Sequence, residues 1–161
     1  MPVTLRVVGA EPLARALARS PELVAAESLR AMTTSLLLVE GDARRNVRHD
    51  TRRLMNSITH RIRGRGTRLV GEVGPSVRYG LYVERGRPAG KKPPPRAALR
   101  GWARRHGIPE SALFVVARAI GRKGIPPRPF LVPAFTKHAD RIVRLFAQAG
   151  QRVVVTLGGA E

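Results

Sequence analysis

One long stretch of helical periodicity, beginning at Pro21, constrains the fold of this chain more than any other feature of its sequence. Ser20 is placed to cap a helix, Pro21 suits its first turn, where no amide partner is needed, and Glu22 lies near the positive end of the helix dipole. Apolar and small residues then recur at helical spacing as far as about His49: Leu29, Met32, Thr33, Leu36, Val39, Ala43 and Val47. The pattern predicts a basic-ended helix on the order of 40 Å long, at 1.5 Å per residue. Gly41 is expected to weaken or kink it, by about 1 kcal/mol relative to Ala.

Strand patterns flank this helix. Residues 56–63 and 67–73 have apolar positions an even number apart and are predicted to form a hairpin around Gly64-Arg65-Gly66. A short strand is predicted at 3–8, closed by a glycine, and a final strand at 152–157.

Segments rich in proline and glycine separate the remaining elements. Residues 86–95 are predicted to form an exposed cationic loop of extended polyproline character. Two short helices are predicted at 96–106 and 109–122, and an amphipathic helix at 134–149. Their expected inward residues are Leu99, Trp102, Leu113, Val116, Ile120, Phe135, Ile142, Leu145 and Phe146. With no internal repeat or visible boundary, the chain is predicted to be a single α+β domain over residues 1–161, with a small antiparallel sheet packed with a long N-terminal helix and a C-terminal helix, plus a short helical hairpin.

The charge balance indicates a polyanionic partner. Lys and Arg number 30 against 11 Asp and Glu, which gives a net charge of +19. Such an excess repels itself unless something anionic lies nearby. The predominance of arginine, with 26 of the 30 cations, also fits a GC-rich coding sequence, but that bias does not explain the scarcity of carboxylates. Nucleic acid is the favoured partner, and a basic surface without a ligand is the alternative.

Most catalytic chemistry finds no support in the sequence. The absence of cysteine excludes disulfides, thiolate metal sites and a cysteine nucleophile. Histidines and carboxylates are scattered, the glycines fit neither a dinucleotide fingerprint nor a P-loop, and no serine stands in a nucleophile elbow. We therefore expect no enzyme activity, no cofactor and no metal.

No segment approaches the roughly 20 apolar residues that span a membrane, and no signal-peptide pattern is present, so we expect a protein made and used in the cytosol, with no membrane partner.

The two short helices also admit a helix-turn-helix interpretation. Four arginines would then lie near DNA phosphates: Arg104, Arg105, Arg118 and Arg122. The first turn of the second helix, from Glu110 to Phe114, lacks the Asn, Gln or Arg that usually reads base edges. A structural helical hairpin is the favoured interpretation.

Three segments resemble signatures of the tail-completion and head-tail joining (neck) proteins of long-tailed bacteriophages, the lambda minor tail protein Z-like family. The first is residues 50–58, DTRRLMNSI, similar to an Asp-Thr-Gly-x-Leu-x-x-Ser-Ile segment that joins helix to sheet. The second is residues 73–86, VGPSVRYGLYVERG, which resembles Val-Gly-Pro followed by Tyr-Ala-x-Tyr-Val-Glu-Phe-Gly. The third is residues 128–135, RPFLVPAF, which resembles Arg-Pro-Phe-Leu-x-Pro-Ala-Leu just before the last helix. The motif residues are Thr51, Leu54, Ser57, Gly74, Pro75, Tyr79, Tyr82, Glu84, Gly86, Arg128, Pro129, Phe130, Leu131 and Pro133.

This sequence departs from the family pattern at three positions. Arg52 stands in place of glycine, Gly80 in place of alanine and Arg85 in place of an aromatic residue, which leaves the local geometry there open.

The motif residues have structural interpretations. Tyr79 and Tyr82 are expected to lie on one face of a helical turn and to bury their rings. Glu84 is either a surface carboxylate or, as favoured, a buried partner for an arginine of this or a neighbouring subunit. The two prolines of the third motif are expected to rigidify the approach to the last helix, which Phe130 and Leu131 anchor in the core.

The resemblance implies a structural virion protein at the phage neck or the head-proximal end of the tail, assembled in the bacterial cytoplasm. It implies a ring around the DNA path, with six copies suggested by tail symmetry and a different patch on each side of every contact. The implied partners are other copies, the head-tail connector, tail terminator and tail tube, and double-stranded DNA bound without sequence specificity. The DNA-facing candidates are Arg44, Arg45, Arg48, Arg52, Arg53, Arg61, Arg63, Arg65, Lys91 and Lys92. The rival interpretations are a free sequence-independent or regulatory DNA-binding protein and, among enzymes, a nuclease.

Overall fold

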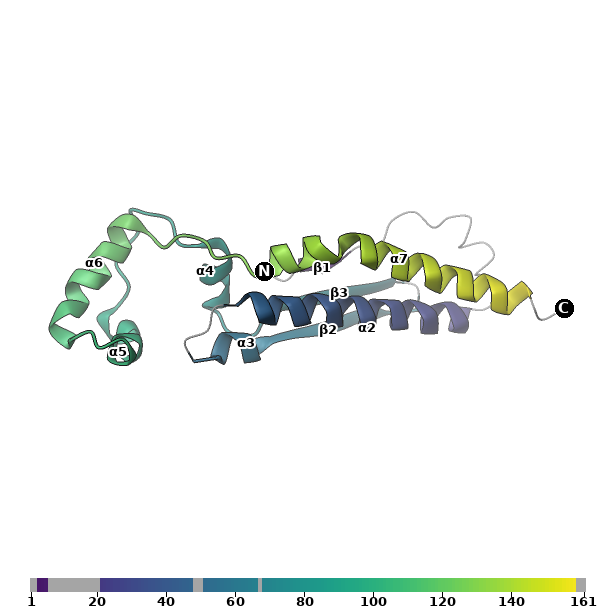
Figure 1. Ribbon diagram of the computed structural model, residues 1–161, viewed down its shortest axis with the longest axis horizontal. Coiled ribbons are helices and arrows are strands. Elements are labelled where there is room, and N and C mark those ends of the chain that lie inside the picture. The colour runs from purple at the N-terminus through teal and green to yellow at the C-terminus, as the bar shows by residue number, and fades with distance from the viewer. Residues whose placement is uncertain (1–2, 6–20, 48–50, 67, 159–161) are drawn as a thin grey trace. The chain divides into compact units, whose positions relative to one another are not determined.

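The computed structural model describes residues 3–5, 21–47, 51–66 and 68–158 (Figure 1). The fold is α+β, as predicted, and it divides into two compact units. Unit 1 comprises Met1–Arg78 and Pro129–Glu161, and unit 2 comprises Tyr79–Arg128. One functional domain over residues 1–161 stays a prediction.

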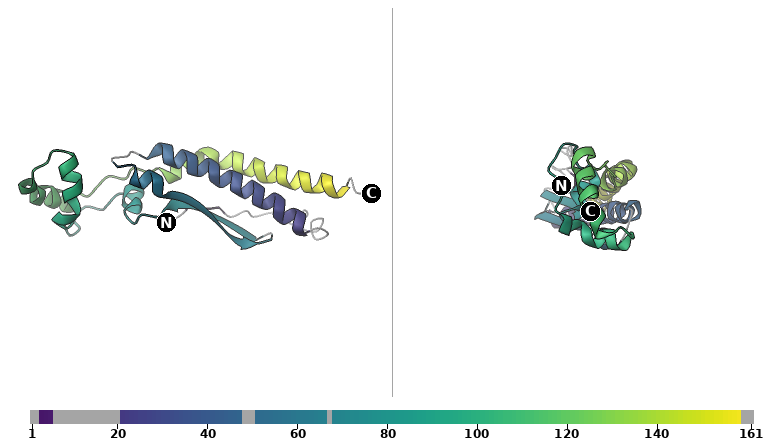
Figure 2. Two further views of the ribbon diagram at one scale, coloured as in Figure 1. Left: turned by 90° about the horizontal axis from the view of Figure 1, so that it is seen from below. Right: turned by 90° about the vertical axis from the view of Figure 1, so that its left-hand side faces the viewer.

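Two long antiparallel helices form one layer of unit 1. Helix α2 (Pro21–Asn46) packs along α7 (Leu131–Gly158), and the two lie side by side over the sheet in the left view of Figure 2. The long helix predicted from Pro21 is therefore confirmed. It continues through Gly41 and ends at Asn46, slightly before the end expected near His49, while the cap expected at Ser20 lies outside the described residues.

A three-stranded antiparallel sheet of order β1-β3-β2 forms the second layer. The strands are β1 (Val3–Leu5), β2 (Ile58–Arg65) and β3 (Arg68–Pro75). The predicted hairpin is confirmed, and so is the first strand over residues 3–5; its expected residues 6–8 lie outside the described part.

The prediction that strand β2 begins at Asn56 was wrong, because a short helix, α3 (Arg53–Ser57), comes first. The Asn56 amide donates to the carbonyl of Arg52 at 2.9 Å, and the Ser57 hydroxyl donates to the carbonyl of Leu54 at 2.7 Å. These bonds close one helical turn, so the extended chain starts at Ile58.

The core of unit 1 lies between α2, α7 and the sheet. Gly71 of β3 lets the sheet approach α2 closely, because a Cβ atom there would lie 2.5 Å from Met32 Sδ and 2.8 Å from Leu36 Cδ2. Phe130 and Leu131 are buried, with Phe130 1 % exposed, as expected for the third motif, while their role as an anchor for α7 stays a prediction. Their burial is expected to hold the start of α7 against the rest of the unit.

The final strand predicted at 152–157 was wrong, because α7 remains helical as far as Gly158. Three consecutive valines, 153–155, favour a strand locally. In the fold, however, Val153 is buried and the Arg152 guanidinium donates to Glu27 of α2 at 2.6 Å. Packing along α2 therefore overrides the local propensity. The helix also begins at Leu131, earlier than expected, and Pro133 falls in its first turn, where an amide is not needed.

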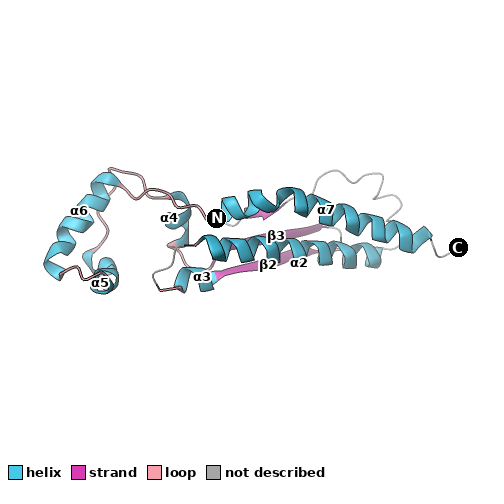
Figure 3. Cartoon of the chain, viewed as in Figure 1, coloured by secondary structure: helices cyan, strands magenta, loops and turns pink. Residues whose placement is uncertain are grey.

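Unit 2 contains short helices only, drawn in cyan in Figure 3. They are α4 (Gly80–Arg85), α5 (Arg96–Arg105), the 3-10 turn η1 (Glu110–Ala112) and α6 (Leu113–Lys123). The predicted loop and the pair of short helices after it are confirmed. α5 packs against α6, and the largest side chain buried in these helices is Leu113.

A backbone bridge closes the base of the α5–α6 hairpin. Arg87 and Ile125 exchange hydrogen bonds of 2.8 and 2.9 Å between their amides and carbonyls. Gly86 and Gly124 precede them, both at φ 73°, and a Cβ atom on Gly86 would lie 2.6 Å from the Ile125 carbonyl oxygen. Only glycine fits this approach without strain, which explains the motif glycine at position 86.

The aromatic residues expected to be buried in unit 2 are exposed, so these predictions were wrong. Trp102 is 37 % exposed, Tyr79 42 % and Tyr82 57 %. The two tyrosines do share a helical turn, with the Tyr82 amide 3.0 Å from the Tyr79 carbonyl oxygen. The unit buries mainly small residues, such as Ala103 and Ala117, and this leaves no interior large enough for the rings.

Candidate nucleic-acid interface and assembly face

Three buried carboxylates of α2 join that helix to its neighbours. Asp42 accepts hydrogen bonds from Arg45 and from two adjacent residues of α7, with Lys137 Nζ at 2.9 Å and His138 Nε2 at 2.6 Å. The hydrogen bond from Lys137 holds the pKa of Asp42 far below its ordinary value, although burial acts to raise it. The Asp42 carboxylate is thus engaged inside unit 1.

The other two carboxylates are paired in the same way. Glu40 binds Arg44 at 2.6 Å and His60 of β2. Glu27 binds Arg152 of α7 at 2.6 Å, which lowers the pKa of its carboxyl group.

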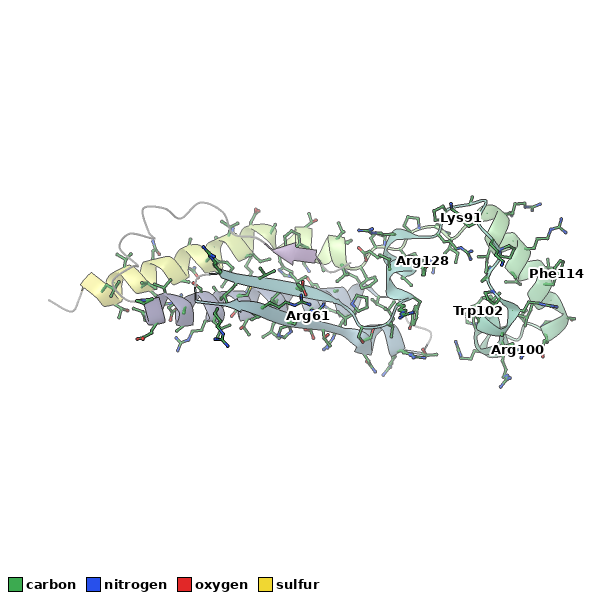
Figure 4. All side chains as sticks on the ribbon, turned by 180° about the vertical axis from the view of Figure 1, so that it is seen from behind. Arg61, Lys91, Arg100, Trp102, Phe114 and Arg128 are labelled. Carbon is green, nitrogen blue, oxygen red and sulfur yellow. The ribbon has the colours of Figure 1, made fainter. Side chains whose placement is uncertain are left out.

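Four of the ten DNA-facing candidates already bind carboxylates within unit 1. Arg44 and Arg45 are paired as above, and Arg44 also donates to the Ile58 carbonyl at 2.8 Å. On the hairpin, Arg61 Nε lies 2.6 Å from Glu72 Oε2 and Arg63 Nη2 lies 3.4 Å from the same oxygen; Arg61 is labelled in Figure 4. Their charges are partly neutralised before any ligand arrives.

The other candidates lie apart from these pairs. Arg52 is exposed, and its backbone has a left-handed conformation at φ 56°. Arg53 is the first residue of α3, and Arg65, the last residue of β2, lies opposite Arg68. Lys91 and Lys92 are exposed in unit 2, and Arg48 lies outside the described residues. The candidates therefore belong to two different units.

Unit 2 carries the densest positive charge, which the prediction from the sequence did not recognise. Its 50 residues hold twelve Lys and Arg against two Glu, a net charge of +10. Unit 1 holds 18 Lys and Arg against nine Asp and Glu, a net charge of +9 over 111 residues. The two units therefore differ in charge density, and the sequence alone does not show where one unit ends and the other begins.

The helix α7 presents an uncharged face toward solvent. This face consists of Val132, Thr136, Ala139, Val143, Ala147, Gly150 and Val154, none of which is buried. At 100° per residue they fall within an arc of about 80°, and every charged residue of α7 lies outside it. Val143 is 69 % exposed and Val154 49 %. The sequence prediction considered only the inward residues of this helix and so missed the uncharged face.

The motif residues lie at junctions between elements. The Ser76 amide donates to the Ser57 carbonyl at 2.9 Å, and Gly74 and Pro75 pair with the first residues of β2, which brings the first two motifs together. Further junctions are made by backbone groups of the third motif: the Arg128 amide donates to the Val83 carbonyl at 2.8 Å, and the Phe130 carbonyl accepts from Asn46 at 3.3 Å.

The remaining motif side chains differ in burial. Leu54 is buried in α3, Thr51, Pro129 and Pro133 are exposed, and Glu84 of α4 is half-buried. Neither interpretation of Glu84 is decided by this position.

Among the described residues, no three His, Asp or Glu side chains gather closely enough to hold a metal ion. None of the described helices combines the length and apolar character needed to cross a membrane.

One family model matches the chain, over residues 11–86; it is the HK97-gp10-like model, described as "Bacteriophage HK97-gp10, putative tail-component". The match includes the first two motif segments and ends at Gly86, while the third motif lies beyond it. No curated protein and no solved structure matches the chain. Residues 11–86 are therefore similar to the HK97-gp10-like family of putative bacteriophage tail components.

Proposed function

We propose that the chain is a structural protein of the phage neck or of the head-proximal end of the tail. In this role, copies form a ring around the DNA path and complete the tail or join it to the head. The similarity of residues 11–86 to a tail-component family carries the proposal, because a tail component is part of the virion and works by binding other tail proteins. A structural family also fits the expectation that the chain is not an enzyme.

The uncharged face of α7 supports assembly of several copies. Subunits that each carry a net charge of +19 repel one another, so copies can approach closely only where the contact is free of like charges. The uncharged face provides such a surface along a helix of 28 residues. A ring requires each copy to present a second, different patch to its neighbour, and tail symmetry suggests six copies.

The charge distribution supports a path for DNA through the assembly. The buried carboxylates of α2 are paired with residues of unit 1, whereas most of the described Lys and Arg side chains are exposed. An exposed cationic lining would bind phosphates without reading sequence. A free sequence-independent or regulatory DNA-binding protein is the alternative that the same charge supports.

Removal of the gene from the phage that encodes it tests the proposal. We expect particles with incomplete tails, or separate heads and tails, in electron micrographs, and restoration by the chain supplied in trans. The isolated chain is expected to be monomeric and to associate only on the tail, since self-repelling subunits bind weakly when alone. Normally joined, infectious particles without the protein would reject the neck role and favour the free DNA-binding alternative.

A further inference from the structure

We propose that unit 2, and not the β2–β3 hairpin, is the part of the chain that binds duplex DNA, through phosphates and without sequence specificity. The proposal rests on the proposed function for the identity of the polyanion. Eight of the ten residues predicted to face DNA lie in unit 1, between residues 44 and 65. The proposal moves the contact to unit 2, which contains only Lys91 and Lys92 of that set.

The first argument is the shortage of carboxylates in unit 2. Unit 2 contains twelve Lys and Arg but only two carboxylates, Glu84 and Glu110, and Arg100 binds Glu110 at 2.7 Å. Most of the cations must therefore remain uncompensated within the unit. On the hairpin, by contrast, Glu72 already binds both Arg61 and Arg63. A phosphate that binds the hairpin would have to displace Glu72 from these arginines, whereas the two carboxylates of unit 2 are too few to occupy most of its cations.

The second argument is the alignment of the cations on the helices. Arg96, Arg100 and Arg104 follow one another at intervals of four along α5, and Arg118 and Arg122 do so along α6. Residues four apart lie on the same face of a helix, and all five side chains are exposed. Each helix thus presents a row of guanidinium groups, which bind phosphates bidentately.

The third argument is that the lysine loop is held against α6. Gly121 of α6 permits this approach, because a Cβ atom there would lie 2.9 Å from Pro93 Cγ and 3.0 Å from the Lys91 carbonyl oxygen. The Arg87 side chain also donates to the Lys92 carbonyl. Lys91 and Lys92 therefore add to the cations of α6, and less ordering is needed when a ligand binds. Figure 4 labels Lys91 on the loop beside this helix.

The fourth argument concerns what unit 2 would recognise. The 3-10 turn that leads into α6 carries Glu110, Ser111 and Ala112, which are poor readers of base edges. The indole ring of Trp102 already stacks on the His106 ring, with centroids 4.8 Å apart, so it is not a free platform for an unpaired base. Phosphates of a duplex are the polyanion that fits best.

Trp102 provides a direct readout, because it is the chain's single tryptophan and lies in unit 2. Its emission in the full-length protein is titrated with a duplex of random sequence at several salt concentrations between 50 and 200 mM. We expect a change on binding, and a logarithm of affinity that falls linearly with the logarithm of salt, by about 0.9 per phosphate neutralised.

Two variants with equal loss of charge locate the contact. The unit 2 variant is Arg104→Ser, Arg118→Ser and Arg122→Ser; the hairpin variant is Arg61→Ser, Arg63→Ser and Arg65→Ser. The unit 2 variant is expected to lower the salt slope by up to about 2.7, whereas the hairpin variant keeps the wild-type slope. Replacing the same three unit 2 arginines by lysine should keep most of the slope, which separates loss of charge from misfolding.

Each contrary outcome has a distinct meaning. Loss of slope in the hairpin variant alone, or no duplex binding by the wild type, would overturn the assignment to unit 2. Equal binding of polyglutamate would also overturn it, in favour of an acidic protein partner. None of these outcomes affects the gene-removal experiment, so the neck role can survive the failure of this inference.

Discussion

His138 of α7 and Asp42 of α2 lie 96 positions apart in the sequence, yet His138 Nε2 is 2.6 Å from the Asp42 carboxylate in the interior of unit 1. Lys137 Nζ binds the same oxygen at 2.9 Å. The carboxylate is therefore a cross-link between the two long helices, and it must be ionised to accept these hydrogen bonds.

This cross-link predicts a specific loss of stability in acid. The pKa of Asp42 is lowered in the fold, chiefly by the hydrogen bond from Lys137, so its ionisation stabilises the protein at any pH above the unfolded value of about 4. The contribution disappears as the pH falls through the lower folded pKa. We expect Asp42→Asn to melt at a lower temperature than wild type at pH 7, with a gap that narrows below about pH 4. Thermal melts between pH 7 and pH 2 measure this, and a gap independent of pH would contradict it.

The long elements were predictable because their signals are local. Apolar residues at helical spacing specify α2, and alternation around a glycine-rich turn specifies the β2–β3 hairpin. The final strand was predicted wrongly because the contacts that keep residues 152–157 helical come from α2. Arg152 pairs with Glu27, 125 positions away in the sequence, so the pair cannot be predicted from the residues near either partner.

Less of the candidate site could be predicted from the sequence. The pairing of Arg61 with Glu72 depends on the strand register, which places those two residues directly opposite each other. The exposure of Trp102 depends on how small the interior of unit 2 is, whereas its sequence spacing is that of an inward residue. Which cations face DNA is a property of the assembly and stays a prediction.

Phe130 is predicted to anchor α7. Its ring is almost fully buried, so Phe130→Ala should lower the free energy of unfolding by about 3–5 kcal/mol through lost transfer energy and a residual cavity. Phe114→Ala is the matched control, because Phe114 is 57 % exposed and its removal should change stability by no more than about 0.5 kcal/mol. Denaturant unfolding compares the two. Equal effects of the two substitutions would reject the anchoring role.

Two glycines of unit 1 should respond oppositely to alanine. At Gly71 a methyl group meets Met32 and Leu36, so Gly71→Ala is expected to destabilise by about 1–3 kcal/mol through overpacking. At Gly41, inside α2, the nearest atom to an added methyl group, apart from the neighbouring residues and the helix backbone, is 3.8 Å away on the flexible Arg45 side chain, so Gly41→Ala is expected to stabilise by about 0.5–1 kcal/mol. The midpoints of denaturant unfolding show the sign of each change. A stabilised Gly71→Ala protein would mean that β3 and α2 are not packed as closely as described.

The uncharged face of α7 is predicted to be a contact between copies, and valine substitutions on two sides of that helix test this. Val143 lies on the face, and Val155, with a similar exposure of 73 %, lies about 120° around the helix among charged residues. Either valine can be replaced by aspartate without burying charge in the isolated chain, so the free energy of unfolding of both proteins should lie within about 0.5 kcal/mol of that of wild type.

In the assembled ring, Val143→Asp would place an unpaired carboxylate in an apolar contact, which is strongly unfavourable. We expect Val143→Asp supplied in trans to restore at least about tenfold fewer infectious particles than Val155→Asp, since 1.4 kcal/mol at one contact is already a factor of ten. Equal restoration by the two variants would show that the copies meet elsewhere, and equal failure would show that any added carboxylate on α7 is harmful regardless of its face.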